Sequence, residues 1–262
     1  MSVWDWARNV LLQLLYRVSG PGAGVRVILL YHSVSLEGGA GREVYTLPLA
    51  DFERQMEFLQ SRFQVVRLCD LAKAMEAQPP DTNLACVTFD DGCVTNYEVA
   101  LPVLERLGIK ATFFVVTGLV GKALRTFAGE VPSMDKEHIR ELAALGHEVG
   151  AHTVSHVKLT QVPIETARAE VQGSKKFLED LLGSQVVSFA YPKGAYNDAV
   201  KQEAARLGFR YAVTIREGLV SWQPDWLALP RVWISPRLSL SAFAAKVSSA
   251  VEWYEWIRGR RW

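Results

Sequence analysis

Two pairs of residues in this chain have the types and spacing of a hydrolytic metal site. His152 and His156 lie four residues apart in GAHTVSH, and Asp90 and Asp91 are adjacent in TFDDG. A zinc-type hydrolytic site needs about three protein ligands and an open position for water. Asp91, His152 and His156 supply such a set. Asp90 is placed to take a proton as water attacks a carbonyl.

Each pattern alone also has a simpler interpretation. HxxxH can place two histidines on one helix face, and Asp-Asp-Gly can be a strand end followed by a turn. Two histidines and a carboxylate also describe the facial triad of non-haem Fe(II) oxygenases. The spare carboxylate of Asp90 and the absence of a jelly-roll strand pattern in the sequence argue against an oxygenase. The two motifs together favour a catalytic site.

The elements that must position these residues follow a βα pattern. Short apolar, β-rich runs alternate with amphipathic stretches, which is typical of a parallel sheet covered by helices. We expect helices over 49–62, 69–77, 96–108, 135–146 and 163–183. We expect strands over 26–32, 64–68, 84–91, 110–116, 148–152, 185–191, 210–215 and 228–234.

The ends of the expected strands carry most of the chemistry. In an α/β barrel the loops after the carboxyl ends of the strands build the active site. Candidate residues at these ends are His32, Asp90, Asp91, His152, Tyr191, Pro192 and Lys193, and the last strand carries Arg231. The sequence therefore predicts that these side chains gather at one rim.

Composition limits the class of protein. The chain has 262 residues, 49% of them hydrophobic, and a net charge of +1. This length fits one large domain, and the charge gives no electrostatic reason to expect nucleic acid. Three cysteines leave one unpaired under any disulfide scheme, and the N-terminus lacks the pattern of a signal peptide. Together these features favour a cytoplasmic location.

Four motifs resemble those of the polysaccharide deacetylase family, carbohydrate esterase family 4. They are TFDDG (88–92), NYEVALPVLERLGIKATFFVVTGLVG (96–121), LGHEVGAHTVSH (145–156) and FAYPKGAYN (189–197). The resemblance extends over about residues 26–234 and implies a distorted (β/α)7-type barrel. It also implies that Asp90 is the general base and that Asp91, His152 and His156 bind a divalent metal.

The resemblance further implies a reaction and a substrate class. The enzyme would hydrolyse an N-acetyl group on an N-acetylated sugar, an oligosaccharide or a lipid-linked glycan, and would release acetate. Zn²⁺ is the expected cation, with Co²⁺, Mn²⁺ and Ni²⁺ as alternatives. The backbone N–H of Lys193 matches the position of the family's oxyanion donor, which belongs to the aromatic residue of an Arg-x-Pro-aromatic motif. A glycan-binding relative that has lost catalysis is the alternative function.

Two departures from the family pattern need substitutes. Ala190 occupies the position of the arginine that orients the base, and the C-terminal Leu-x-His that supplies the general acid is missing. Arg231 is the candidate for the orienting role, although it also suits a surface ion pair. His32, in LLYH, resembles the Tyr-His of a rearranged subgroup that acts on poly-N-acetylglucosamine, where the histidine is the general acid.

Other residues have weaker signals. Tyr191, Pro192 and Trp233 suit an aromatic platform for a sugar, and each equally suits the core. His138 and His147 lie on or beside the helix before the fifth strand and suit structural or solvent-facing roles.

The chain divides into an amphipathic N-terminal helix (1–20), a catalytic barrel (21–240), and a C-terminal helix with a Trp/Arg-rich tail (241–262). Five of the eight tryptophans lie near the two ends: Trp4, Trp6, Trp253, Trp256 and Trp262. This crowding fits peripheral membrane association on the cytoplasmic face, or packing of the two ends on each other or on a second subunit.

Periodicity refines the expectation for the two end helices. In the first, Val3, Ala7, Val10, Leu11, Leu14, Leu15 and Val18 form an apolar stripe opposite Asp5, Asn9 and Gln13. That stripe suits docking on the barrel or lying in a bilayer interface. In the last, the spacing predicts that Trp256 points outward and that Phe243, Val247, Val251 and Tyr254 point inward. Three arginines follow, Arg258, Arg260 and Arg261.

Overall fold

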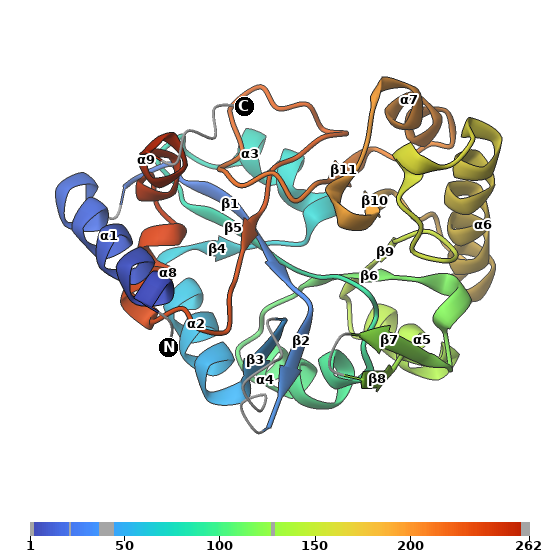
Figure 1. Cartoon of the computed structure of the whole chain (residues 1–262), viewed down its shortest axis with the longest axis horizontal. Helices are drawn as coiled ribbons and strands as arrows, with labels where there is room; N and C mark the ends of the chain where they lie inside the picture. Colours follow the sequence, from blue (N-terminus) through green and yellow to red (C-terminus); the bar gives the residue numbers. More distant parts are fainter. Residues whose placement is uncertain (1–2, 21, 37–44, 127–128, 258–262) are drawn as a thin grey trace.

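The computed structural model describes residues 3–20, 22–36, 45–126 and 129–257. Its centre is a curled parallel sheet in the order β11-β10-β9-β6-β5-β1-β12, with a short strand, β4, paired to the start of β5 (Figure 1). The strands are β1 (Arg26–Tyr31), β4 (Gln64–Val65), β5 (Leu84–Phe89), β6 (Thr112–Val115), β9 (Glu148–Ala151), β10 (Ser188–Ala190), β11 (Tyr211–Val213) and β12 (Val232–Trp233). This architecture confirms the distorted α/β barrel expected from the sequence.

Apolar strands and amphipathic helices explain the layering. Every residue of β1 and β5 is buried, as expected where helices and loops cover both faces of a parallel sheet. The helices lie around the outside of the sheet (Figure 1). They are α1 (Val3–Ser19), α2 (Leu49–Arg62), α3 (Leu71–Ala77), α4 (Leu101–Arg106), α5 (Lys136–Ala144), α6 (Ile164–Leu182), α7 (Asp198–Arg206), α8 (Leu240–Lys246) and α9 (Ala250–Ile257).

Local chemistry sets several helix boundaries. The side chains of Asp135, Asn197 and Ser239 each accept a hydrogen bond from a backbone N–H in the first turn of α5, α7 and α8. Helix α6 ends where Gly183 adopts a left-handed conformation with φ of 66°. A π-helical turn, Asn96–Ala100, precedes α4, and its Asn96 bonds to the carbonyl of His32, directly after β1.

Several expected strands are shorter in the structure. The segments 64–68, 185–191, 210–215 and 228–234 reduce to β4, β10, β11 and β12. Two further pairs of strands were not predicted. Strands β2 (Ser33–Ser35) and β3 (Thr46–Pro48) pair in parallel, and β7 (Ala123–Thr126) and β8 (Gly129–Pro132) pair antiparallel. Their sequences lack an apolar run or a clear alternation, so pattern reasoning has no signal for them.

The first helix and the last two helices meet at one side of the sheet. Helix α1 contacts α8 and α9 (Figure 1). Helix α1 does not bury the whole apolar stripe expected from the sequence. Leu12 and Asn9 are buried. Three residues of the stripe are exposed instead: Ala7, Leu14 and Val18. The side chains of Trp4 and Trp6, and residues 258–262, lie outside the description. No helix in the described residues is long and apolar enough to cross a membrane.

Candidate functional site

The carboxyl ends of three strands bring the candidate residues together at one rim. His32 follows β1, Asp90 and Asp91 follow β5, and His152 follows β9. The backbone N–H of Asp90 donates to the carbonyl of Tyr31, and that of His152 donates to the carbonyl of Val115. These bonds continue the sheet pairing to the rim, so the rigid sheet fixes the start of each catalytic loop.

Asp91, His152 and His156 form a cluster suited to a divalent cation. Their ligand atoms all lie within 4.8 Å of one another. Asp91 Oδ1 is 3.6 Å from His152 Nε2 and 3.5 Å from His156 Nε2. Ligand atoms around a tetrahedral zinc ion are about 3.3–3.5 Å apart at ordinary bond lengths. The three side chains therefore fit such an ion with little movement.

A backbone contact orients His152. Its Nδ1 donates to the carbonyl of Ala190 at 2.7 Å, which leaves Nε2 directed toward Asp91. Metal-binding histidines commonly donate their second ring nitrogen to a carbonyl or carboxylate. The sequence did not indicate this role, because a backbone carbonyl has no residue-type signature.

The backbone is strained at this rim. In the described residues, the non-glycine residues with positive φ are Asp91 (74°), Thr153 (66°), His156 (59°) and Lys193 (57°). Two of these are candidate ligands, and a third is the candidate oxyanion donor. Left-handed conformations in side-chain-bearing residues cost energy and concentrate at functional sites. With these left-handed backbone conformations, the side chains of Asp91 and His156 both lie in the cluster.

Arg231 holds Asp90 with a buried bidentate ion pair. Its Nη1 donates to Asp90 Oδ1 at 2.7 Å and its Nη2 donates to Asp90 Oδ2 at 2.6 Å. Its Nε donates to the carbonyl of Thr214, so the guanidinium is fixed on both sides. Burial raises the pKa of Asp90, but the charge and hydrogen bonds of Arg231, together with His152 and His32, outweigh it, so the net pKa is lowered. Asp90 is therefore held as an anion, and Arg231 is not a surface residue.

The two histidines of the cluster differ in their protonation behaviour. Burial, followed by the nearby His152, lowers the pKa of His156 to about 4, which keeps its imidazole neutral. Burial also acts to lower the pKa of His152, but Asp91, Asp90 and the Ala190 carbonyl together raise it by more. Metal ligation needs neutral imidazole, which His156 already provides.

His32 lies beside the cluster under an aromatic ring. Its ring centroid is 4.7 Å from that of Tyr45, and its buried Nδ1 has no hydrogen-bond partner among the described residues. Burial lowers the pKa of His32, while Asp91 and Asp90 oppose that shift. The carbonyl of His32 accepts a hydrogen bond from Asn96 Nδ2 at 2.7 Å, which ties the π-helical turn to this residue. Neither Asn96 nor Tyr45 was predicted as part of the site.

The expected sugar platform is only partly present. Tyr191 is fully buried, its hydroxyl donates to the carbonyl of Leu227, and its ring stacks on Tyr196. Pro192 is also buried. These two residues belong to the core, which corrects their prediction as sugar contacts. Trp233 is half-buried and its ring centroid lies 6.4 Å from that of Tyr45, so it remains a candidate contact.

The turn after β10 gives Lys193 its unusual backbone. Lys193 is exposed and left-handed, and the next two N–H groups bond back to Tyr191 and Pro192. The Lys193 charge contributes to the lowered pKa of His156, so the turn lies near the cluster.

The other two histidines take part in helix and sheet contacts. The Nδ1 of buried His147 accepts from the N–H of Ala111, and its Nε2 contacts Glu105 at 2.9 Å. His138 completes the capping box of α5 with Asp135. Their structural interpretation from the sequence agrees with these contacts.

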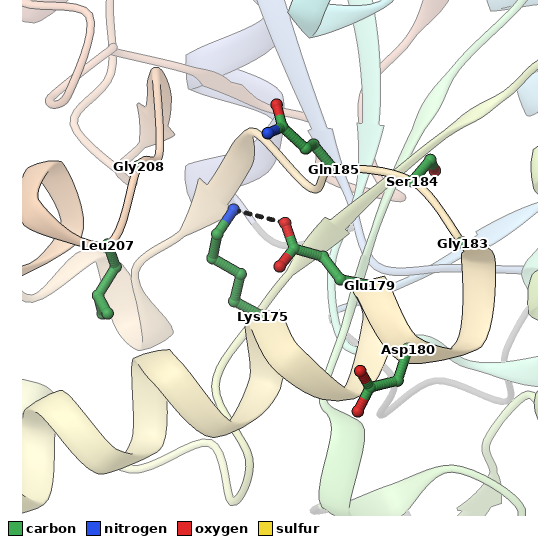
Figure 2. A pocket seen from close by; sticks show the side chains of 8 residues that line it. All are labelled: Lys175, Glu179, Asp180, Gly183, Ser184, Gln185, Leu207 and Gly208. Carbon is green, nitrogen blue, oxygen red and sulfur yellow. Dashed lines mark ion pairs between the residues drawn. The ribbon is translucent and has the colours of Figure 1, made fainter.

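A surface hollow of about 540 Å³ lies away from the rim, between the ends of α6 and α7 (Figure 2). Its main charged pair is internally satisfied, because Lys175 and Glu179 form an ion pair at 2.9 Å and both bond to the backbone of Val186. The hollow is lined by Lys175, Glu179, Asp180, Gly183, Ser184, Gln185, Leu207 and Gly208. These residues carry no catalytic constellation comparable to the rim.

Comparisons with known proteins agree with this geometry. A sequence profile described as polysaccharide deacetylase matches residues 77–212. A relative from Bacillus subtilis is YxkH, whose name describes it as a polysaccharide deacetylase. It is 33% identical over 85% of this chain and 76% of its own length. A poly-β-1,6-N-acetyl-D-glucosamine N-deacetylase of Staphylococcus aureus is 26% identical over 73% of this chain and 68% of its own length.

A solved structure gives the same result at the level of the fold. The deacetylase PplD of Streptococcus pyogenes, in complex with acetate, superposes with a TM-score of 0.75 and 27% identity. The match covers 86% of this chain and 98% of PplD. These matches favour a deacetylase over the two alternative functions, an Fe(II) oxygenase and a non-catalytic glycan-binding protein. The chain belongs to the polysaccharide deacetylase family, and it is a carbohydrate N-deacetylase with a candidate Asp91–His152–His156 metal site.

Proposed function

We propose that the chain removes N-acetyl groups from N-acetylglucosamine residues of a β-linked polymer and belongs to the rearranged subgroup with an N-terminal Tyr-His. The observation that carries this proposal is the juxtaposition at one rim of His32, the Asp90–Arg231 pair and the metal cluster. We take the polymer from the name of the S. aureus relative, a poly-β-1,6-N-acetyl-D-glucosamine N-deacetylase. The acetate bound to PplD is the product expected of such a reaction.

Asp91, His152 and His156 would hold the cation, with Zn²⁺ proposed first and Co²⁺, Mn²⁺ or Ni²⁺ as alternatives. A bound divalent cation would polarise the acetyl carbonyl and lower the pKa of the attacking water. The donor set of two imidazoles and one carboxylate suits zinc and leaves a position open. The spacing of the ligand atoms supports this assignment.

Asp90 would act as general base. It is an anion because Arg231, together with His152 and His32, offsets its burial, and it is adjacent to Asp91 in the chain. Arg231 keeps both carboxylate oxygens at fixed positions, so the base does not need to reorganise during proton transfer. Arg231 thus takes the orienting role for which Ala190 has no side chain.

His32 would act as general acid toward the leaving amine. Its lowered pKa makes the imidazolium a stronger acid, so a proton taken up during the cycle is readily passed to the nitrogen. Asn96 fixes the backbone of His32, and the Tyr45 ring lies against its imidazole. The pair Tyr31-His32 at the end of β1 is the sequence feature that resembles the rearranged subgroup.

The backbone N–H of Lys193 would donate to the developing oxyanion. Such a preorganised donor is worth about 3–4 kcal/mol of transition-state stabilisation. The left-handed turn at Lys193 supports the assignment, because the effect of the Lys193 charge on the pKa of His156 indicates that this residue lies near the cluster. Half-exposed Tyr45 and Trp233 would contact the sugar faces.

The test combines a substrate panel with one variant. Acetate release should be greatest with a β-1,6-linked N-acetylglucosamine oligomer, compared with β-1,4-linked oligomers, peptidoglycan fragments and lipid-linked N-acetylated sugars. His32→Ala should lower kcat by about 10²- to 10⁴-fold, while the bound metal stays as in wild type. His138→Ala is the matched control, because it replaces a histidine outside the rim.

Two results would contradict the proposal in different ways. Greater activity on another glycan would overturn the polymer and leave the catalytic roles in place. Unchanged kcat in His32→Ala would overturn the acid assignment and the resemblance to the rearranged subgroup.

A further inference from the structure

Two neighbouring helices at the side of the barrel expose an apolar surface. Leu14 and Val18 of α1 are 51% and 87% exposed, and Trp253, Trp256 and Ile257 of α9 are 55%, 58% and 49% exposed. We call these five residues the end patch. They are half of the ten large hydrophobic residues exposed in the described chain. Since α1 and α9 contact each other, the exposed residues come from adjacent elements (Figure 1).

Polar contacts fix the rotation of α1 that exposes this surface. Asn9 Nδ2 donates to the carbonyl of Arg237, and Gln13 Nε2 donates to the hydroxyl of Ser241 at 2.7 Å. Leu12, between them, is fully buried. A rotation that buried Leu14 and Val18 would break these hydrogen bonds. The outward apolar side of α1 is therefore part of the folded structure.

Helix α9 is amphipathic with its aromatic side outward. Val251 and Tyr254 pack into the core, as the sequence predicted, while Trp253 and Trp256 point away from it. The two tryptophans and Glu252 line a surface hollow of about 370 Å³. Tryptophan in such a position favours the boundary between lipid headgroups and acyl chains, because its ring is apolar and its N–H remains hydrated.

Basic residues accompany the aromatic ones. Arg17 is exposed in the last turn of α1, next to Val18. The chain continues from α9 with Arg258, Arg260, Arg261 and Trp262. Arginine beside exposed tryptophan is the composition of an interfacial anchor on an anionic membrane.

The end patch is distant from the catalytic rim along the strands. Only residues 20–25 separate α1 from the start of β1, and Gly22 lies close to Ser249, just before α9. Both junctions are at the end of β1 opposite His32. A surface bound there would leave the rim open to a glycan chain.

We propose that the end patch docks on the interface of an anionic lipid bilayer, with Trp253 and Trp256 inserted and Arg17 near the headgroups. This inference is independent of the proposed substrate. The compartment expected from the sequence, the cytoplasmic side, stays a prediction.

The experiment is flotation of the full-length protein with phosphatidylglycerol-containing vesicles and with neutral phosphatidylcholine vesicles. We expect binding to the anionic vesicles at low salt and weaker binding at high salt, because arginines near the surface interact with the lipid charge. Trp253→Ser/Trp256→Ser should weaken binding about tenfold or more. Trp222→Ser is the matched control, because Trp222 is 53% exposed outside the patch.

Further measurements distinguish loss of docking from loss of folding. Leu14→Ser/Val18→Ser, on the other helix, should also weaken binding, and both double variants should keep the wild-type rate of acetate release from a soluble substrate. The proposal is overturned if the wild type does not float with anionic vesicles. It is equally overturned if the tryptophan variant floats like the wild type, or if the patch instead forms a dimer that the variant dissociates.

Discussion

Strand β9 has a buried polar cluster at each end. At its start, Glu148 Oε2 accepts from the N–H of Cys69 and the hydroxyl of Thr112, and Oε1 accepts from Ser188. Beyond its other end, His152 belongs to the candidate metal site. The first cluster has ordinary backbone conformations, whereas the second includes left-handed residues such as Asp91 and His156.

The difference shows which buried polar groups serve the fold and which suit chemistry. The Glu148 cluster is satisfied by protein donors, as expected of a structural network. At the rim, the buried Nδ1 of His32, Oγ1 of Thr95 and Oδ1 of Asn96 have no hydrogen-bond partners among the described residues. Strain and unpaired polar atoms together, rather than burial of charge alone, distinguish the catalytic end.

Removing Arg231 should have the largest effect on both stability and activity. Arg231→Met leaves the buried Asp90 carboxylate without its counter-charge, which costs about 3–5 kcal/mol. Urea unfolding should show that loss, and acetate release should fall because the base is no longer oriented. An Arg231→Met protein with wild-type stability and activity would contradict the claim that Arg231 holds the buried Asp90 for catalysis.

Arg168 provides the matched control for this prediction. It also forms two hydrogen bonds with one carboxylate, at 2.8 and 3.1 Å to Glu203, but its side chain is 46% exposed. Arg168→Met should therefore leave stability and acetate release close to those of wild type.

A change at the other end of β9 should separate stability from activity. Glu148→Gln replaces one acceptor oxygen by a donor NH2 group, so this buried network must rearrange or lose a hydrogen bond, at a cost of about 1–3 kcal/mol. The urea midpoint should fall, whereas kcat under folding conditions should stay within about twofold of wild type. A large fall in kcat without a fall in stability would show that this cluster also serves catalysis.

The smallest expected effect is a change in the pH dependence of stability. Burial lowers the pKa of His147 from its usual 6.5, although Glu105 opposes the shift. The unfolded chain therefore takes up this proton near pH 6.5 and the folded chain only at lower pH, so stability falls as pH decreases below about 6.5. His147→Asn should show a smaller fall in melting temperature between pH 7.5 and 5.5. If the fall in melting temperature is the same in His147→Asn and wild type, groups other than His147 cause the pH dependence.

Much of the rim was predictable from short motifs. Asp90, Asp91, His32 and His152 each follow a strongly apolar strand, and parallel strands bring their carboxyl ends to one edge. Arg231 was placed near Asp90 because the family's arginine is absent at Ala190. These predictions depended on strand ends, which apolar runs mark well.

Other features depend on contacts that the sequence does not display. Stacking of Tyr45 on His32 and support by Asn96 join segments that are distant in the chain. Tyr191 has the aromatic ring of a sugar contact, but after β10 the chain directs this side chain into the core. The rotation of α1 is set by hydrogen bonds of Asn9 and Gln13, which compete with the apolar stripe.

The most direct test of the account is metal titration of the stripped protein with acetate release as the readout. Wild type and His138→Ala should lose activity on chelation and recover it at about one bound Zn²⁺ per chain, whereas His156→Ala should neither retain metal nor recover. Full acetate release by the stripped wild type, or recovery of His156→Ala in parallel with wild type, would contradict the assignment of the rim as a metal-dependent deacetylase site.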